Sequence, residues 1–208
     1  MFVSSATLWV FIPTFFFVSI TPGMCMTLSM TLGMSIGVRR TLWMIIGELL
    51  GVGLVAIAAL SGVAAIMLLY PMIFTVIKLA GGAYLFYLGI QLWRSKGKMA
   101  LSLDDSASMS KSRLELALQG FVTATTNPKG WAFFIALLPP FIHSSEHIAA
   151  QAASLISIML SLEFACLLMY ATGGRFLSQK LQRQGNVSLV NRIAGSLMIG
   201  VAIWLAVG

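Results

Sequence analysis

Charged residues are scarce in this chain of 208 residues. Asp, Glu, Lys and Arg make up 9% of it, whereas soluble domains carry about 25%. Acidic residues are the scarcer sign, with 6 Asp and Glu against 13 Lys and Arg and a formal net charge of +7. Together with 59% apolar residues, this shortage argues against a soluble domain and predicts an integral membrane protein.

The chain also lacks the motifs of several function classes. Its two cysteines, Cys25 and Cys166, lie in apolar stretches, so we expect no disulfide. No Lys or Arg precedes Arg39, so the amino terminus is expected to remain as a membrane span rather than act as a secretory signal. Without a nucleophile triad, a phosphate loop or a nucleic-acid-binding motif, we predict no enzyme, no cofactor and no nucleic-acid partner.

One stretch, His143-Ser-Ser-Glu146-His147, matches the pattern of some zinc proteases. It follows Pro139-Pro140 in a short outer turn, whereas ligands of that kind need a long helix and a third ligand. We therefore predict no metal site.

Long apolar stretches are abundant. A helix needs about 20 apolar residues to cross a bilayer core, and this chain has several stretches of that length. They are Leu8–Leu32, Leu42–Met67, Met72–Trp93, Glu115–Leu138, Ile148–Thr172 and Leu189–Val207. The predicted fold is an all-α integral membrane protein with six transmembrane helices, in which paired glycines such as Gly47 and Gly51 allow close helix contact.

Basic residues gather in three of the connections between these spans. They are Arg39 and Arg40 after the first span, five residues of the polar stretch Arg94–Arg113 after the third, and Arg175, Lys180, Arg183 and Arg192 after the fifth. The positive-inside rule puts these connections in the cytoplasm. Both termini are therefore predicted to lie outside it.

The two halves of the chain share an order of features. Each has a proline-interrupted span, a span with one glutamate (Glu48 or Glu163) and a span that opens on basic-x-Ala-Gly (Lys78 or Arg192). Because each set has three spans, the second is inverted relative to the first, as in many secondary transporters. The predicted division is a repeat at 1–93, a cytoplasmic loop at 94–113 and a repeat at 114–208. The alternative is coincidence in a glycine-rich apolar sequence.

Proline breaks the first and fourth spans. Unwound backbone at membrane depth must be buried in protein or line a cavity, so two such breaks predict a transporter's binding site. The predicted substrate-binding residues are Thr21, Pro22, Gly23, Asn127, Pro128 and Lys129. Lys129 and the helix start after Pro128 suit a substrate carboxylate, and carbonyl oxygens at the first break suit its amine. The alternative is that both breaks are structural kinks.

Glu48 and Glu163 are the two acids well inside spans. Burial disfavours the charged form of a carboxyl group, so either glutamate could take up and release a proton in a proton-coupled transporter. One proton crossing 100 mV supplies about 2.3 kcal/mol. The alternative is a static ion pair of either glutamate with Lys129, Lys78 or Arg192.

Several motifs resemble the LysE/RhtB family of bacterial amino-acid exporters. They are Thr21-Pro22-Gly23, Gly37, the basic-x-Ala-Gly-Gly start with Tyr84-Leu85-x-Tyr87-Leu88-Gly89, Gly120-Phe121 and Thr126-Asn127-Pro128-Lys129. The resemblance covers essentially the whole chain, although members often have proline at the position of Met24 and an acid about one turn after Glu48. It implies efflux of amino acids across the bacterial inner membrane, driven by the proton gradient.

The function predicted from the sequence is export of neutral amino acids such as threonine, homoserine or leucine by proton antiport. Few acids are available to hold a second cationic group, which argues against lysine as the substrate. The alternatives are an exporter of another small solute or cation on the same scaffold and a non-transporting membrane scaffold subunit. Glycine-lined helix faces are compatible with a homodimer.

Overall fold

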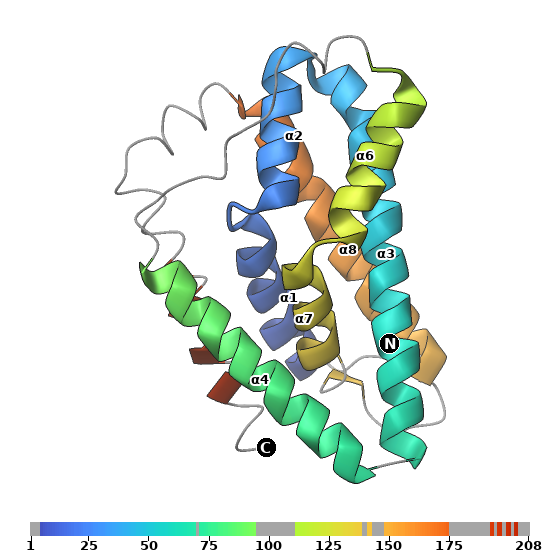
Figure 1. The fold of residues 1–208 in the computed structure, drawn as a ribbon, viewed down its shortest axis with the longest axis vertical. Coiled ribbons are helices and arrows are strands. Elements are labelled where there is room, and N and C mark those ends of the chain that lie inside the picture. The colour runs from blue at the N-terminus through green and yellow to red at the C-terminus, as the bar shows by residue number, and fades with distance from the viewer. Residues whose placement is uncertain are drawn as a thin grey trace.

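The computed structural model describes residues 5–69, 71–94, 111–138, 141–142 and 148–174, with residues 192–193, 195–196, 199–200 and 202–203 near the carboxyl terminus. The elements of the described part are helices (Figure 1). They are α1 (Ser5–Ile20), α2 (Met24–Ser35), α3 (Val38–Leu69), α4 (Pro71–Arg94), α6 (Arg113–Thr125), α7 (Pro128–Leu137) and α8 (Ile148–Thr172). The prediction of an all-helical protein is confirmed for these residues.

The first predicted span is broken where the sequence indicated. Helices α1 and α2 meet at an angle of 57° across a short break that contains Pro22. Proline has no N–H to donate to the preceding turn, so α1 ends at Ile20. Gly23 is extended, with φ −140°, and its carbonyl accepts the first hydrogen bond of α2 from Thr27 N at 2.9 Å.

The fourth predicted span is also broken. Helix α6 ends at Thr125, and α7 begins at Pro128. The Asn127 side chain accepts a hydrogen bond of 3.1 Å from Lys129 N and so caps α7, while Pro128 suits the first helical position because its missing N–H would have no partner there. The start of α6 carries a capping box between Ser112 and Glu115.

The remaining described helices follow the predicted spans closely. Helix α3 contains the second predicted span and extends beyond both of its ends, α4 contains the third, and α8 coincides with the fifth. By length and hydropathy, 38–62 and 148–172 can each cross a membrane, and the bent pair α1 and α2 can form one further span. Most of the sixth span, the stretch His143–His147 and residues 95–110 lie outside the described residues.

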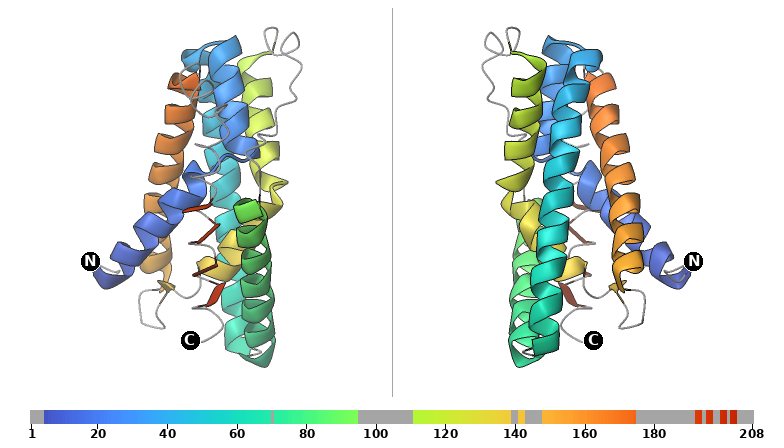
Figure 2. Two further views of the ribbon diagram at one scale, coloured as in Figure 1. Left: turned by 90° about the vertical axis from the view of Figure 1, so that its left-hand side faces the viewer. Right: turned by 90° about the vertical axis from the view of Figure 1, so that its right-hand side faces the viewer.

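Helix α3 is the central element and packs against α6, α7 and α8 (Figure 2). Its contact with α6 is a glycine crossing: a Cβ at Gly47 would overlap the Ala117 carbonyl, and a Cβ at Gly120 would overlap the Met44 carbonyl. The two backbones therefore approach as closely as the predicted small-residue contact requires. Helix α2 meets α8 in the same way, since Gly33 lies against the backbone of Ala171.

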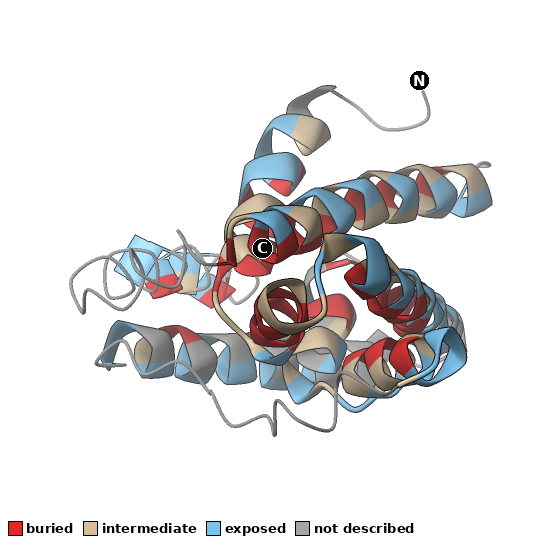
Figure 3. Ribbon diagram, turned by 90° about the horizontal axis from the view of Figure 1, so that it is seen from above, coloured by how far each residue is buried: buried red, intermediate tan, exposed pale blue. Residues whose placement is uncertain are grey.

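The outer faces of the helices are apolar. On α3, Leu50, Leu54 and Ile57 are 64%, 52% and 54% exposed, and their spacing places them on one stripe. Buried residues face inward between the helices (Figure 3). Soluble monomers seldom expose large contiguous apolar patches, so this outer stripe is suited to lipid.

Basic residues from two predicted cytoplasmic connections lie at one end of the bundle. Arg40 Nη2 donates a hydrogen bond of 2.5 Å to the Lys111 carbonyl. Arg113 lies over the ring of Trp43, 5.5 Å from its centroid. The start of α3 and the start of α6 therefore share an end, as the prediction of a common side for these two connections requires.

Candidate functional site

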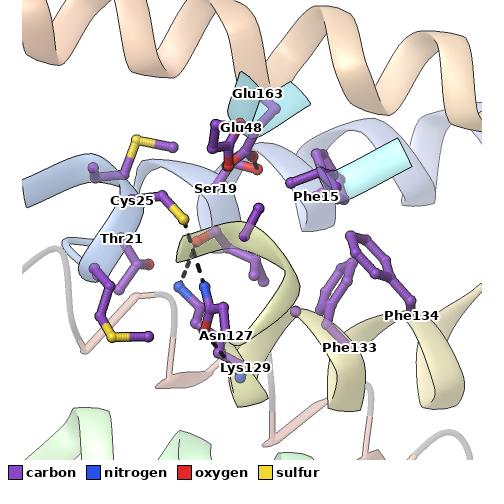
Figure 4. A pocket seen from close by; sticks show the side chains of 17 residues that line it. Phe15, Ser19, Thr21, Cys25, Glu48, Asn127, Lys129, Phe133, Phe134 and Glu163 are labelled. Atoms are coloured by element: carbon purple, nitrogen blue, oxygen red, sulfur yellow. Dashed lines mark hydrogen bonds between the residues drawn. The ribbon is translucent and has the colours of Figure 1, made fainter. Parts of the chain in front are cut away.

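A pocket of about 60 Å³ lies between the two helix breaks. Both breaks contribute to it, and a Cβ at Gly23 would lie 3.9 Å from Lys129 Nζ. The lining residues are Phe15, Val18, Ser19, Thr21, Gly23, Met24, Cys25, Met26, Glu48, Val52, Ala124, Asn127, Lys129, Gly130, Phe133, Phe134 and Glu163 (Figure 4). The structure thus brings both breaks and both intramembrane glutamates into one place.

Most of the predicted site residues line this pocket. Those that do are Thr21, Gly23, Asn127, Lys129, Glu48 and Glu163. Pro22 and Pro128 are not among the lining residues, and each lies in one of the two breaks. Their contribution is to end or begin a helix at the pocket wall.

The first break leaves carbonyls at the end of α1 without helical partners. Two of them are satisfied by side chains: Val18 O by Lys129 Nζ at 3.0 Å and Ile20 O by Tyr170 Oη at 2.8 Å. Thr21 Oγ1 also donates to Phe17 O, at 2.6 Å. The bond to Val18 follows from the proline, because that carbonyl would otherwise accept from the missing N–H of residue 22. Lys129, which follows the second break, therefore provides a hydrogen-bond donor to a carbonyl that the first break leaves without one.

The two glutamates have different surroundings. Glu163, on α8, is 9% exposed, and its Oε2 accepts a hydrogen bond of 2.5 Å from Ser19 Oγ. Glu48, on α3, is fully buried, and neither of its oxygens has a hydrogen-bond partner among the described residues. The two carboxyl groups are neighbours at one side of the pocket (Figure 4).

The static ion pairs that were the alternative are not formed within hydrogen-bond distance among the described residues, although the charges of Glu163 and Lys129 act on one another. Lys129 Nζ bonds a carbonyl, and neither glutamate forms an ion pair with it there. Arg192 lies over the ring of Trp93, 5.5 Å from its centroid. The side chain of Lys78 lies outside the part that the structure describes.

Several lining residues were not predicted from the sequence. Cys25 Sγ accepts a hydrogen bond of 3.7 Å from Asn127 Nδ2, which joins the start of α2 to the start of α7. Phe15, Phe133 and Phe134 form an apolar wall beside the polar groups (Figure 4). With 13 phenylalanines in the chain, no sequence signal separates those that face the pocket from those that face lipid.

We expect Asn127→Ala to destabilise the protein by about 1 kcal/mol, because the substitution removes the side-chain cap of α7. The matched variant Asn127→Ser keeps a capping oxygen and should lose only a small part of this stability. The midpoint of thermal unfolding in detergent measures both variants. Equal losses for Ser and Ala would show that the cap contributes little.

The described fold and its pocket define a class of protein: a helical membrane protein with buried ionisable groups at paired helix breaks. The sequence identifies the family to which this protein belongs. The chain belongs to the LysE type translocator family, whose model matches residues 16–208. The resemblance that the motifs indicated is confirmed, and the protein is a translocator rather than an enzyme.

Several relatives match nearly the whole chain. A homoserine/homoserine lactone efflux protein of Salmonella typhimurium is 28% identical over 188 residues, which cover 90% of each chain. A leucine efflux protein of Enterobacter sp. is 26% identical over 205 residues, 95% of this chain and 94% of that protein. An uncharacterized membrane protein of Vibrio cholerae is 28% identical over 188 residues, again 90% of each chain. No solved structure matches the sequence.

Proposed function

We propose that this protein exports neutral amino acids, with leucine and homoserine as the first candidates, across the bacterial inner membrane by proton antiport. The observation that carries the proposal is the pocket between the two helix breaks, which combines one lysine, two buried carboxyl groups and an aromatic wall. Two efflux proteins for such amino acids are similar over nearly the whole chain. The proposed architecture has six spans in two inverted repeats, with both termini outside the cytoplasm.

The polar part of the pocket suits an amino-acid carboxylate. Met24 at the start of α2 and Lys129 in the first turn of α7 both line it, and helix starts carry partial positive charge and free N–H groups. Lys129 adds a full positive charge beside them. In this proposal the substrate carboxylate lies between the two helix starts and Lys129.

The apolar part suits an uncharged side chain. Phe15, Phe133 and Phe134 offer apolar surface, and Val52 extends it. A cavity needs roughly 10–15 Å³ to hold a water molecule, so a pocket of about 60 Å³ has room for only a few atoms in this conformation. Small and mid-sized neutral amino acids are therefore favoured over larger solutes.

Export is tested in a host that lacks its own leucine and homoserine exporters. Cells that express the protein should grow at concentrations of leucine-containing dipeptide or of homoserine that stop cells with the empty vector, and their internal pool of that amino acid should be lower. A protonophore should abolish the difference if the antiport proposal holds. Unchanged growth and unchanged pools for both compounds would contradict the proposed function.

A further inference from the structure

Glu48 is buried inside the protein and has no hydrogen-bond partner among the described residues. It is fully buried, lines the pocket, and has no partner for either carboxyl oxygen among the described residues. An ionised carboxylate in that position is costly unless it is paired. Glu48 must therefore either hold a proton or lie against a cation that does not belong to the described residues.

The groups that face Glu48 do not supply that cation. They are the Cys25 thiol from α2 and the Glu163 carboxyl from α8. Helix α6 approaches Glu48 through Gly120, which has no side chain. On α7, Lys129 donates to Val18 O and lies across the pocket from Glu48 (Figure 4).

Several other acceptors near the pocket already have a hydrogen-bond partner. Glu163 accepts from Ser19, and the carbonyls of Phe17, Val18 and Ile20 accept from side chains. A ligand's ammonium group needs acceptors that are free. Among the described lining residues, Glu48 offers two unpartnered acidic oxygens to such a group.

We propose that Glu48 binds either a proton or the ammonium group of the transported amino acid, and that the two exclude one another. The proposal rests on the proposed function and deepens it, because it assigns the amine subsite and the coupling step to one residue. When an amino acid enters from the cytoplasm, its ammonium group displaces the proton of Glu48 to that side. When it leaves on the outer side, a proton from that side replaces it, so one proton moves inward for each amino acid exported.

Binding of three probes to the wild-type protein in lipid nanodiscs tests this without any substitution. The probes are L-leucine, 3-methylbutylamine, which lacks the carboxylate, and 4-methylpentanoate, which lacks the amino group. Affinity for leucine and for the amine should fall as the pH is lowered, by up to about tenfold per pH unit for one competing proton. Affinity for 4-methylpentanoate should not fall in this way. The same loss for all three probes would overturn the proposal.

Substitutions then locate the competing group. Glu48→Gln should weaken leucine binding at least tenfold and remove its pH dependence, while 4-methylpentanoate still binds and so reports a folded pocket. Glu48→Asp should keep the pH dependence, and the matched variant Glu163→Gln should keep it as well. Loss of the pH dependence in Glu163→Gln instead of Glu48→Gln would overturn the proposal.

The proposed export function and the proposed role of Glu48 can fail separately. If wild-type protein binds neither leucine nor homoserine at any pH, the proposed function fails, and this inference fails with it. If wild-type protein binds leucine and Glu48→Gln binds it equally well with the same pH dependence, the proposed function stands and the inference fails. A requirement for Na⁺ in place of the proton effect would also overturn it.

Discussion

Lys129→Met is expected to lower export to a tenth of the wild-type rate or less. Within the described pocket lining, Lys129 is the single Lys or Arg, and its Nζ donates a hydrogen bond of 3.0 Å to Val18 O. A hydrogen bond to a charged group contributes about 1.5–3 kcal/mol, and every 1.4 kcal/mol is about tenfold. Methionine keeps the length and apolar stem of the side chain but cannot bind a carboxylate.

The measurement is the initial rate of leucine efflux from preloaded cells, corrected for the amount of protein in the membrane. Lys111→Met is the matched control, because the same substitution is made at a lysine that bonds Gln119 Oε1 and does not line the pocket. It should export at the wild-type rate. Full export by Lys129→Met would mean that the substrate does not need a cation at this position.

The second large effect is expected at the crossing of α3 and α6. A Cβ at Gly120 would overlap the Met44 carbonyl and the Glu48 backbone nitrogen, and one at Gly47 would overlap the Ala117 carbonyl. These are backbone atoms, so the helices must separate to make room. We expect Gly120→Ala and Gly47→Ala each to destabilise the protein by about 1–3 kcal/mol, the usual cost of overpacking.

Gly53→Ala is the matched control on the same helix. A Cβ there would meet only the side chain of Leu160, at 3.8 Å, which is ordinary contact. Alanine is favoured over glycine in a helix by about 1 kcal/mol, so this variant should be as stable as wild type or more so. Thermal unfolding midpoints in detergent compare the variants, and equal midpoints for Gly120→Ala and Gly53→Ala would contradict the close crossing.

Much of the local structure could be predicted because its causes are local. Proline ends α1 and begins α7 through its missing N–H, and Asn127 caps α7 through its own side chain. The fifth span was predicted at the bounds of α8 because an apolar run long enough to cross a bilayer is visible in the sequence itself. Paired glycines such as Gly47 indicated close helix contact, but not which helix would be the partner.

The parts of the site that were not predicted depend on residues far apart in the chain. Lys129 bonds the carbonyl of Val18, 111 residues away, and Ser19 bonds Glu163, 144 residues away. Nothing in the sequence distinguishes Glu163, which has such a partner, from Glu48, which has none among the described residues. Nor does the sequence distinguish the phenylalanines of the pocket wall from those that face lipid, because lipid-facing and core-facing side chains in a membrane protein are equally apolar.

Composition, motifs and proline positions were enough to identify a helical membrane protein of the LysE type translocator family and to locate two interruptions in its helices. Composition and proline positions act through backbone chemistry and segment length alone, so their effects can be predicted without knowing which helices are in contact. That the two interruptions face one pocket, and that Glu163 has a hydrogen-bond partner while Glu48 has none among the described residues, is visible only in the folded structure. Hydrogen-bond partners depend on which helices pack together. Helices that are apolar on every face have no sequence pattern that predicts which helices will be neighbours.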